Sequence, residues 1–120
     1  MTIRRKLLGR QGEEAAAQYL EKNGYRILCR NYRCRLGELD LIALDGGVLV
    51  FVEVRTRSGD LFGLAQESVT VRKQKKLRQL AWYYLKAFGK AGSACRFDVV
   101  AILFDRESQV KKLEHIENAF

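Results

Sequence analysis

The sequence predicts a mixed α/β domain in which helices pack on a single β-sheet. Helical and extended patterns follow one another in the order α-β-β-β-α-β-β, and the chain contains no proline that would interrupt a strand. Its 120 residues are enough for one hydrophobic core, so we expect a single domain over residues 1–120.

The first half of the chain is expected to contain one helix and three strands. Residues 10–23 are predicted to be helical, because Ala16, Ala17 and Leu20 recur at helical spacing and Gly24 supplies a stop. The three expected strands cover residues 25–32, 38–45 and 48–55.

The second half begins with residues 56–69, which have glycines and no sustained period and are expected to form a loop. A long helix over 70–88 follows. Its apolar stripe is formed by Leu77, Leu80, Ala81, Tyr84, Leu85 and Phe88. Two further strands are expected over 97–104 and 110–116, on either side of a turn.

The formal net charge of +8 favours a polyanionic partner. No acidic residue occurs between Glu67 and Asp98, so helix 70–88 carries charge of one sign where solvated helices usually mix Glu with Lys. We therefore predict that this helix binds nucleic-acid phosphates without reading base sequence. The residues expected to make these contacts are Arg72, Lys73, Lys75, Lys76 and Arg78. Trp82 is expected to pack against the protein rather than to stack on bases.

Other features argue against export and membrane insertion. No apolar run approaches the ~20 residues of a membrane helix, and the initial MTIRRKLLGR lacks the apolar stretch of a signal peptide. We expect a cytoplasmic protein without membrane contact. Cys29, Cys34 and Cys95 show no paired spacing and are expected to be reduced thiols, and His115 is assigned no role.

Acidic residues interrupt the two apolar strands that flank Gly46 and Gly47. A two-residue Gly-Gly loop predicts a type I′ hairpin, in which both glycines have positive φ. Counting back from that loop places Asp40 directly opposite Glu53, with Cβ atoms about 4.5–5.5 Å apart. It also places residues 38, 40, 42 and 44 on one face of the hairpin, together with 49, 51, 53 and 55. A register shifted by one loop position would place Glu38 opposite Glu53 instead, so either register brings two carboxylates together.

Facing carboxylates repel each other unless a divalent cation lies between them. Asp40 and Glu53 are therefore candidate ligands of Mg²⁺ or Mn²⁺, and Arg55 points the same way from the next outward position on its strand. The alternative is a structural ion network in which Glu38 and Asp40 pair with Arg55 and Arg57. The spacing of the residues leaves both interpretations open.

Glu13 is a third acid that could reach the same site. It extends the helical stripe of Ala16, Ala17 and Leu20, whereas its neighbour Glu14 falls off that stripe. Glu13 is therefore either a first-turn acid that complements the helix dipole or an acid directed at the metal cleft.

Several motifs, in this order along the chain, resemble the YraN family, also called UPF0102. They are GxxGE (9–13), NGYRIL (23–28) with NYR (31–33), GELDLIA (37–43), VFVEVRTR (50–57), RFDVVAI (96–102) and the terminal HIENAF. The resemblance covers almost the entire chain. It implies membership of the PD-(D/E)xK nuclease superfamily, akin to Holliday-junction resolvases and restriction endonucleases, with a restriction-endonuclease-like core whose mixed β-sheet is flanked by helices on both sides.

The resemblance also assigns roles to individual residues. It makes Asp40 and Glu53 the metal ligands, together with the Val54 carbonyl, and it makes Glu13 the acid of the first helix. Arg55 stands where the superfamily usually has lysine, and Glu38 and Arg57 are expected beside the ligands. Arginine stays protonated, so Arg55 can stabilise charge on the phosphate but cannot act as a general base.

The function implied by the resemblance is an Mg²⁺- or Mn²⁺-dependent endonuclease that acts on structured or branched DNA, rather than RNA, and forms a homodimer as resolvases do. One alternative is a non-catalytic nucleic-acid-binding module on the same fold, acting with a partner helicase or nuclease. A third hypothesis is an interaction protein whose acids are structural, which predicts weak affinity for DNA.

Overall fold

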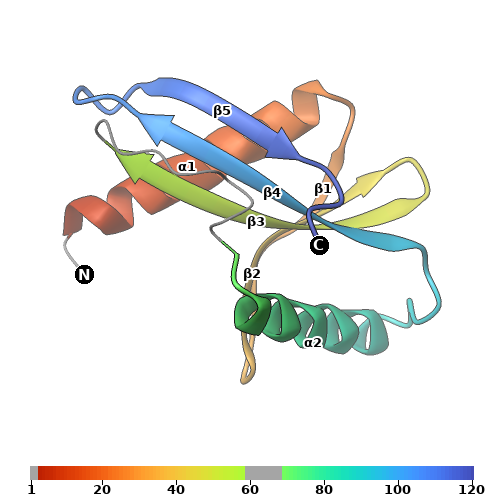
Figure 1. Cartoon of the computed structure of the whole chain (residues 1–120). Coiled ribbons are helices and arrows are strands. Elements are labelled where there is room, and N and C mark those ends of the chain that lie inside the picture. Colours follow the sequence, from red (N-terminus) through yellow and green to blue (C-terminus); the bar gives the residue numbers. More distant parts are fainter. Residues whose placement is uncertain (1–2, 59–68) are drawn as a thin grey trace.

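The computed structural model describes residues 3–58 and 69–120 (Figure 1). Seven elements follow the predicted order: α1 (Ile3–Lys22), β1 (Arg26–Cys34), β2 (Gly37–Asp45), β3 (Val48–Ser58), α2 (Val71–Ala87), β4 (Cys95–Phe104) and β5 (Val110–Ile116). Most of the loop expected over 56–69 lies outside the described residues, and its first three residues prolong β3. None of the described helices has the length and apolar character needed to cross a membrane.

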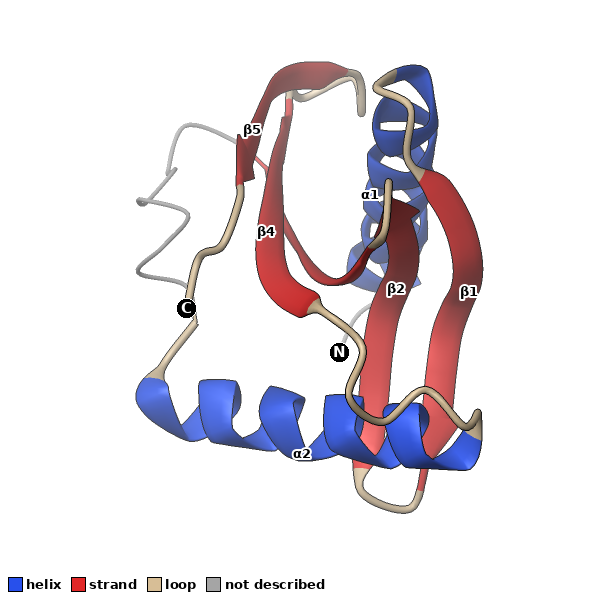
Figure 2. Cartoon of the chain, turned by 90° about the vertical axis from the view of Figure 1, so that its right-hand side faces the viewer, coloured by secondary structure: helices blue, strands red, loops and turns tan. Residues whose placement is uncertain are grey.

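The five strands form one mixed sheet in the order β1-β2-β3-β4-β5, and only the β3–β4 pair is parallel. The two helices cover opposite faces of this sheet (Figures 1 and 2). Ala16, Ala17 and Leu20 of α1 pack on one face, and Leu77 and Leu80 of α2 pack on the other. The predicted fold class, an α/β protein with helices on both sides of a mixed sheet, is confirmed, and it is consistent with a restriction-endonuclease-like core.

Helix α1 begins at Ile3, well before the predicted start at residue 10. The predicted start was wrong because residues 3–9 show no clear apolar stripe: Ile3 and Leu7 are exposed, whereas Leu8 is buried. Inside the predicted helix, a Cβ atom added at Gly12 would lie 2.3 Å from Oγ1 of Thr56 on β3. Glycine at this position therefore allows the helix to pack closely on the sheet, and Leu8, one turn earlier, is buried beneath the same helix.

The β2–β3 register agrees with the one counted from the Gly-Gly loop, since Asp45 pairs with Val48 and Leu41 with Val52. The shifted register is therefore excluded. The turn type was predicted wrongly, because only Gly46 has positive φ (61°), which is the pattern of a type II′ rather than a type I′ turn.

The sheet divides next to the acidic residues. The β2–β3 ladder stops at the Leu41–Val52 pair, whereas β2 stays paired with β1 as far as Gly37 and β3 stays paired with β4 as far as Ser58. The β1–β2 hairpin thus leaves the rest of the sheet and extends toward α2 (Figure 2). We call this point of separation the fork; Asp40 and Glu53 are the first residues beyond it.

The regular alternation of side chains in β2 is broken at the fork. Leu39 and Ile42 both pack in the layer of α2, although an uninterrupted strand would direct them to opposite faces. Leu41 packs in the layer of α1. The expectation that residues 38, 40, 42 and 44 share one face is therefore wrong, and Glu38 is turned away from the face of Ile42.

Candidate metal centre and the basic helix beside it

Asp40 is the central acid of the fork. Its carboxylate accepts a hydrogen bond from the backbone N–H of Val54 at 2.8 Å, which holds the side chain between β2 and β3. Desolvation by burial, followed by the nearby Glu53 carboxylate and then by Glu13, raises the pKa of Asp40 to about 8. The negative charge on Asp40 is therefore costly in the absence of a cation.

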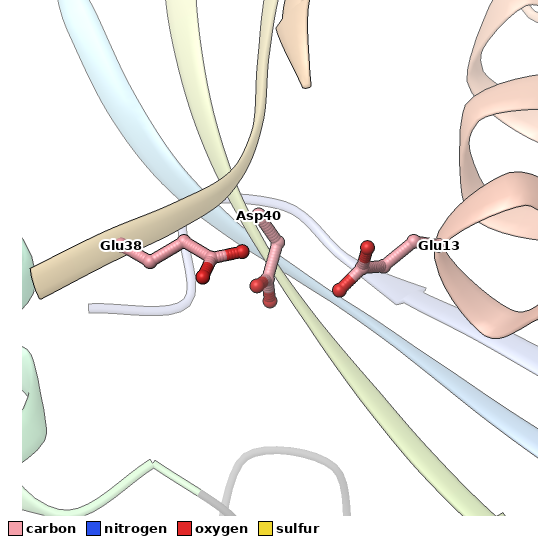
Figure 3. A group of neighbouring side chains, drawn as sticks. All are labelled: Glu13, Glu38 and Asp40. Carbon is pink, nitrogen blue, oxygen red and sulfur yellow. The ribbon is translucent and has the colours of Figure 1, made fainter. Parts of the chain in front are cut away.

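Glu13 and Glu38 approach Asp40 from two other directions. One carboxylate oxygen from each of Glu13, Glu38 and Asp40 lies within 4.8 Å of the other two. Figure 3 shows Glu13 reaching in from α1, while Glu38 points along β2 toward Asp40. Burial, and then repulsion by Glu38, raise the pKa of Glu13 above its usual value. We call Glu13, Glu38 and Asp40 the acidic triad.

Asn31 connects two members of the triad. With its amide nitrogen turned toward the acids, the orientation that its neighbours favour, it donates to Glu13 Oε1 at 3.0 Å and to Glu38 Oε1 at 2.6 Å. Its backbone has φ 53°, a left-handed conformation that asparagine tolerates better than most residues. The sequence motif NYR contains this residue, but nothing in its spacing indicated a contact with the acids.

The acidic triad fits a small divalent cation. Mg²⁺ binds carboxylate oxygens at about 2.0–2.1 Å in octahedral geometry, so two ligand oxygens are about 3 Å apart when adjacent and about 4 Å apart when opposite. The triad oxygens lie within 4.8 Å of each other, so a bound ion would draw them together by up to about 2 Å. All three donors are hard oxygen ligands, which suit Mg²⁺ or Mn²⁺ better than a softer metal.

Glu53 faces the triad from the other branch of the fork. It is a buried carboxylate, 6% exposed, and it forms ion pairs with Arg55 at 3.5 Å and with Lys73 of α2 at 3.6 Å. The sequence predicted Glu53 as a ligand and Glu38 only as a neighbour; the structure gathers Glu38 with Glu13 and Asp40, and it places Glu53 between Asp40 and two cations. Sequence spacing did not indicate that Lys73 would reach this site.

Arg55 lies beside Glu53, but only part of its guanidinium group is paired. Its buried Nε has no hydrogen-bond partner among the described residues. The alternative ion network had the wrong partners: Glu38 pairs with Arg33 at 3.1 Å, and the exposed Arg57 donates to the carbonyl of Thr56. Within the described part of the chain, Arg55 thus keeps one unpaired donor beside Glu53, whereas Arg57 forms no ion pair with the acids.

Helix α2 brings its cations to the same region. Its N-terminal half borders an open depression of about 480 Å³, lined by Thr70, Arg72, Lys73, Lys75, Lys76 and Gln79. Lys73 belongs both to this depression and to the ion pair with Glu53, so the basic surface reaches the fork. Arg78 is separate from it, because its guanidinium packs over the rings of Phe97 and Phe120.

The aromatic residues of α2 differ from the prediction at two positions. Trp82 was expected to pack against the protein, but 58% of its surface is exposed. Phe88, expected in the apolar stripe, follows the last helical residue and is equally exposed. The helical period was correct for the rest of the stripe, whose other members are all buried.

A second polar network surrounds Asp98 of β4, which is fully buried. Its carboxylate accepts hydrogen bonds from Arg96 Nε at 3.0 Å and from the backbone N–H of Asn118 at 3.0 Å, and His115 Nε2 lies 2.8 Å away. Burial alone would raise the pKa of Asp98, but the hydrogen bonds from His115, Arg96 and Asn118 outweigh it and lower that pKa.

This network ties the chain terminus to the sheet. Arg96 also donates to Asp45 at 3.0 Å and to the hydroxyl of Tyr25 at 2.6 Å, and the other ring nitrogen of His115 lies 3.1 Å from the hydroxyl of Tyr19. His115, to which the sequence assigned no role, is thus part of a buried structural network. An aspartate inside the apolar run RFDVVAI was the signal that could have revealed it.

The fold and the fork define an α/β protein with a restriction-endonuclease-like core and an acidic triad that could hold a metal. A model of the uncharacterised protein family UPF0102 matches residues 12–102. A UPF0102 protein of Pelotomaculum thermopropionicum is 70% identical over 120 residues, and one of Moorella thermoacetica is 55% identical over 120 residues, both matches covering 100% of each chain. A third, from Desulforamulus reducens, is 52% identical over 121 residues and 99% of each chain. The chain belongs to the UPF0102 family.

Proposed function

We propose that this protein is a nuclease that uses Mg²⁺ or Mn²⁺ to hydrolyse phosphodiester bonds in structured or branched DNA. The observation that carries the proposal is the ion pair between Lys73 and Glu53. It joins the basic surface of α2 to the cluster of carboxylates, so a DNA backbone held on α2 would pass beside the acids.

Each group at the fork has a part in the proposed reaction. Glu13, Glu38 and Asp40 would hold the cation, with Glu53 completing the site from β3. A bound divalent cation supplies polarisation of the phosphate and lowers the pKa of water. The hydrolysis adds water to phosphorus and breaks one P–O ester bond, which leaves a phosphate on one end and a hydroxyl on the other. Lys73 would fix the scissile phosphate against the acids.

Arg55 would neutralise charge that develops on the phosphate, since its guanidinium contacts Glu53 at the fork and its buried Nε has no hydrogen-bond partner among the described residues. A guanidinium group has donors and no acceptor, so it cannot remove a proton from water. The same property favours a second candidate function, a nucleic-acid-binding module that keeps the nuclease fold but does not cleave. In that case the protein would act with a partner helicase or nuclease.

The two candidates differ in a cleavage assay on labelled four-way, flapped, single-stranded and duplex DNA in Mn²⁺, Mg²⁺ or EDTA. We expect metal-dependent cutting that is lost in Asp40→Asn and Glu53→Gln, while DNA affinity is retained within about threefold because the basic face is intact. Arg55→Met should lower the rate by about 100-fold, the usual loss when one charge-stabilising donor is removed. Arg57→Met, on the same strand but outside the fork, is the matched control.

Either candidate can fail on its own terms. DNA binding without cutting in any metal would reject the nuclease and favour the binding module. Cutting that survives in both Asp40→Asn and Glu53→Gln would point to a contaminating enzyme. Absence of both DNA binding and DNA cutting would reject both the nuclease and the binding module.

A further inference from the structure

The outward face of α2 carries aromatic side chains that the proposed metal chemistry does not use. Trp82 is 58% exposed and Tyr83 is 42% exposed, although burying such rings is ordinarily favourable. Gln79 lies three to four residues before them and Lys86 three to four after them, so all four share one face of the helix. The depression in the N-terminal half of α2 therefore continues into an exposed aromatic surface.

The positive charge of this face favours an anionic ligand. Lys75, Lys76 and Lys86 lie on the same side of the helix as the two rings, and all three are exposed. No acidic residue offsets them between Glu67 and Asp98 in the sequence. Rings among cations match the chemistry of an unpaired nucleotide, which offers a base to stack and a phosphate to pair.

An unpaired base matches Trp82 better than a duplex does. Inside a duplex the faces of each base are covered by its neighbours, so an exposed indole gains stacking only from a base that is free. The face also has a fixed relation to the fork, because Lys73, at its inner edge, contacts Glu53. Along the helix axis, Trp82 lies about 13 Å from Lys73 at about 1.5 Å per residue, and it lies on the opposite side of the helix, because nine residues make about two and a half turns. A strand with one phosphate at the fork would therefore cross the exposed cations of α2 before a base several nucleotides away reached Trp82.

We propose that Trp82 is the stacking site for an unpaired base of a DNA strand whose phosphate lies at the acidic triad. This inference rests on the proposed nuclease function, whose substrate it narrows to DNA with a single-stranded segment beside the cut. Tyr83 and Lys86 complete the site, the first as a neighbouring ring and the second as a phosphate contact.

Trp82 is the only tryptophan of the chain, so its intrinsic fluorescence reports this site alone. The full-length protein is titrated in EDTA, which prevents cleavage, with oligothymidylate, with a duplex of equal length and with the corresponding RNA. We expect saturable quenching by the single-stranded DNA and little quenching by the duplex at equal occupancy. Occupancy is measured separately, by anisotropy of a label on the nucleic acid.

Two variants test the role of the ring. Trp82→Leu keeps apolar volume and helix propensity but removes the aromatic face, and we expect about a tenfold loss of affinity for single-stranded DNA. Its affinity for duplex should change by less than about twofold, because the cations are intact. Trp82→Phe should recover most of the lost affinity. The exposure of Trp82 means that both variants should fold, which circular dichroism checks.

Each outcome decides the inference. Single-stranded DNA that binds without quenching, or with equal affinity to Trp82→Leu, would overturn it. Stronger quenching by RNA would overturn the assignment to DNA, and quenching by neither nucleic acid would assign the face to a protein partner. The wild-type protein and Trp82→Leu could both cut flapped and duplex DNA equally in Mn²⁺. That result would reject the stacking site but would support the proposed nuclease activity. Quenching by single-stranded DNA without cutting of any substrate supports the stacking site and removes the nuclease.

Discussion

The carboxylate of Asp40 accepts a hydrogen bond from the backbone N–H of Val54 across the point at which β2 separates from β3. The Asp40 side chain thus accepts a hydrogen bond from a backbone amide just beyond the end of the β2–β3 pairing. The same contact keeps a charged group in a position where burial and Glu53 raise its pKa to about 8. Ionised Asp40 therefore lowers the stability of the metal-free protein, although a cation would bind best to the ionised form.

We predict that Asp40→Asn stabilises the metal-free protein at high pH. The folded pKa of Asp40, about 8, lies above the ordinary value of 3.8, so the folded protein keeps a proton that the unfolded chain releases. The favourable contribution of this proton is full below about pH 4 and is lost as pH rises through about 8. Urea denaturation in EDTA should show wild-type stability falling between pH 5 and 8.5 relative to Asp40→Asn, which has no such titration and can still accept from Val54.

Asp40→Ala is the comparison for that experiment. It also lacks the charge, but it leaves the Val54 N–H without its acceptor, so it should be less stable than Asp40→Asn by about 1–3 kcal/mol at every pH. A wild-type protein whose stability parallels that of Asp40→Asn across the whole pH range would contradict the raised pKa.

We predict that Glu13→Gln weakens Mn²⁺ binding and that Glu14→Gln does not. The two residues are adjacent on α1, but Glu13 belongs to the acidic triad whereas Glu14 is exposed and pairs with Arg30. Loss of a ligand should lower the affinity by at least about tenfold, the smaller end of the effects seen for groups that only support a ligand. Isothermal titration calorimetry measures both variants, and equal affinities would remove Glu13 from the site.

We predict opposite effects of alanine at the two glycines of α1. Gly9 has open space around its Cα, so Gly9→Ala should stabilise the helix by up to about 1 kcal/mol. Gly12→Ala would place a methyl group 2.3 Å from Thr56 Oγ1, and we expect a net loss of about 1 kcal/mol or more because overpacking outweighs the gain in helix propensity. Thermal denaturation compares the two.

The double variant Gly12→Ala/Thr56→Ala checks the cause of that loss. Removing Oγ1 removes the contact, so the double variant should be more stable than the sum of the single changes indicates. Strict additivity would show that Thr56 is not the obstacle.

We predict that Asp98→Asn destabilises the protein by about 3 kcal/mol near neutral pH, because it leaves the guanidinium of Arg96 without its buried counter-charge. The sign of the pH dependence is the reverse of that for Asp40. The folded pKa of Asp98 is lowered, so its contribution is present above the ordinary pKa near 4 and is lost as pH falls.

Acid titration of stability therefore separates the two aspartates. Between pH 5 and 2, Asp98→Asn should lose less stability than the wild type does. Asp105→Asn serves as the control, because the Asp105 carboxylate accepts local hydrogen bonds from the amides of Glu107 and Gln109, whose loss should cost about 1 kcal/mol. A cost at Asp98 no larger than at Asp105 would show that the buried network contributes little.

Local chemistry predicted most of the fold. Helical spacing identified the buried stripe of α2, and the Gly46–Gly47 loop gave the register that brings Asp40 near Glu53. Each of these depends on contacts between residues that are close in sequence. The close packing that requires Gly12 was not predicted, because it arises from Thr56, a residue far away in the chain.

Less of the site could be predicted from the sequence, because its geometry also depends on tertiary packing. The position of Glu38 in the acidic triad depends on the break in alternation at Asp40, and that of Asn31 depends on a left-handed residue in β1. The contact between Lys73 and Glu53 requires the parallel β3–β4 crossover that carries α2. All three are products of tertiary packing, which periodicity does not encode.

The fork has a further consequence for the metal-free protein. Beyond Leu41 and Val52, β2 and β3 each have one edge that pairs with no other strand within residues 3–58 and 69–120, and such edges readily pair with any strand that approaches. Charged side chains that point inward are one of the means by which proteins prevent this pairing. Glu38 and Glu53 occupy these internal edges, and Asp40 accepts the N–H of Val54, so a foreign strand would meet acidic side chains and a donor that is already used. We therefore expect the acids that would bind a cation also to protect the open sheet from aggregation.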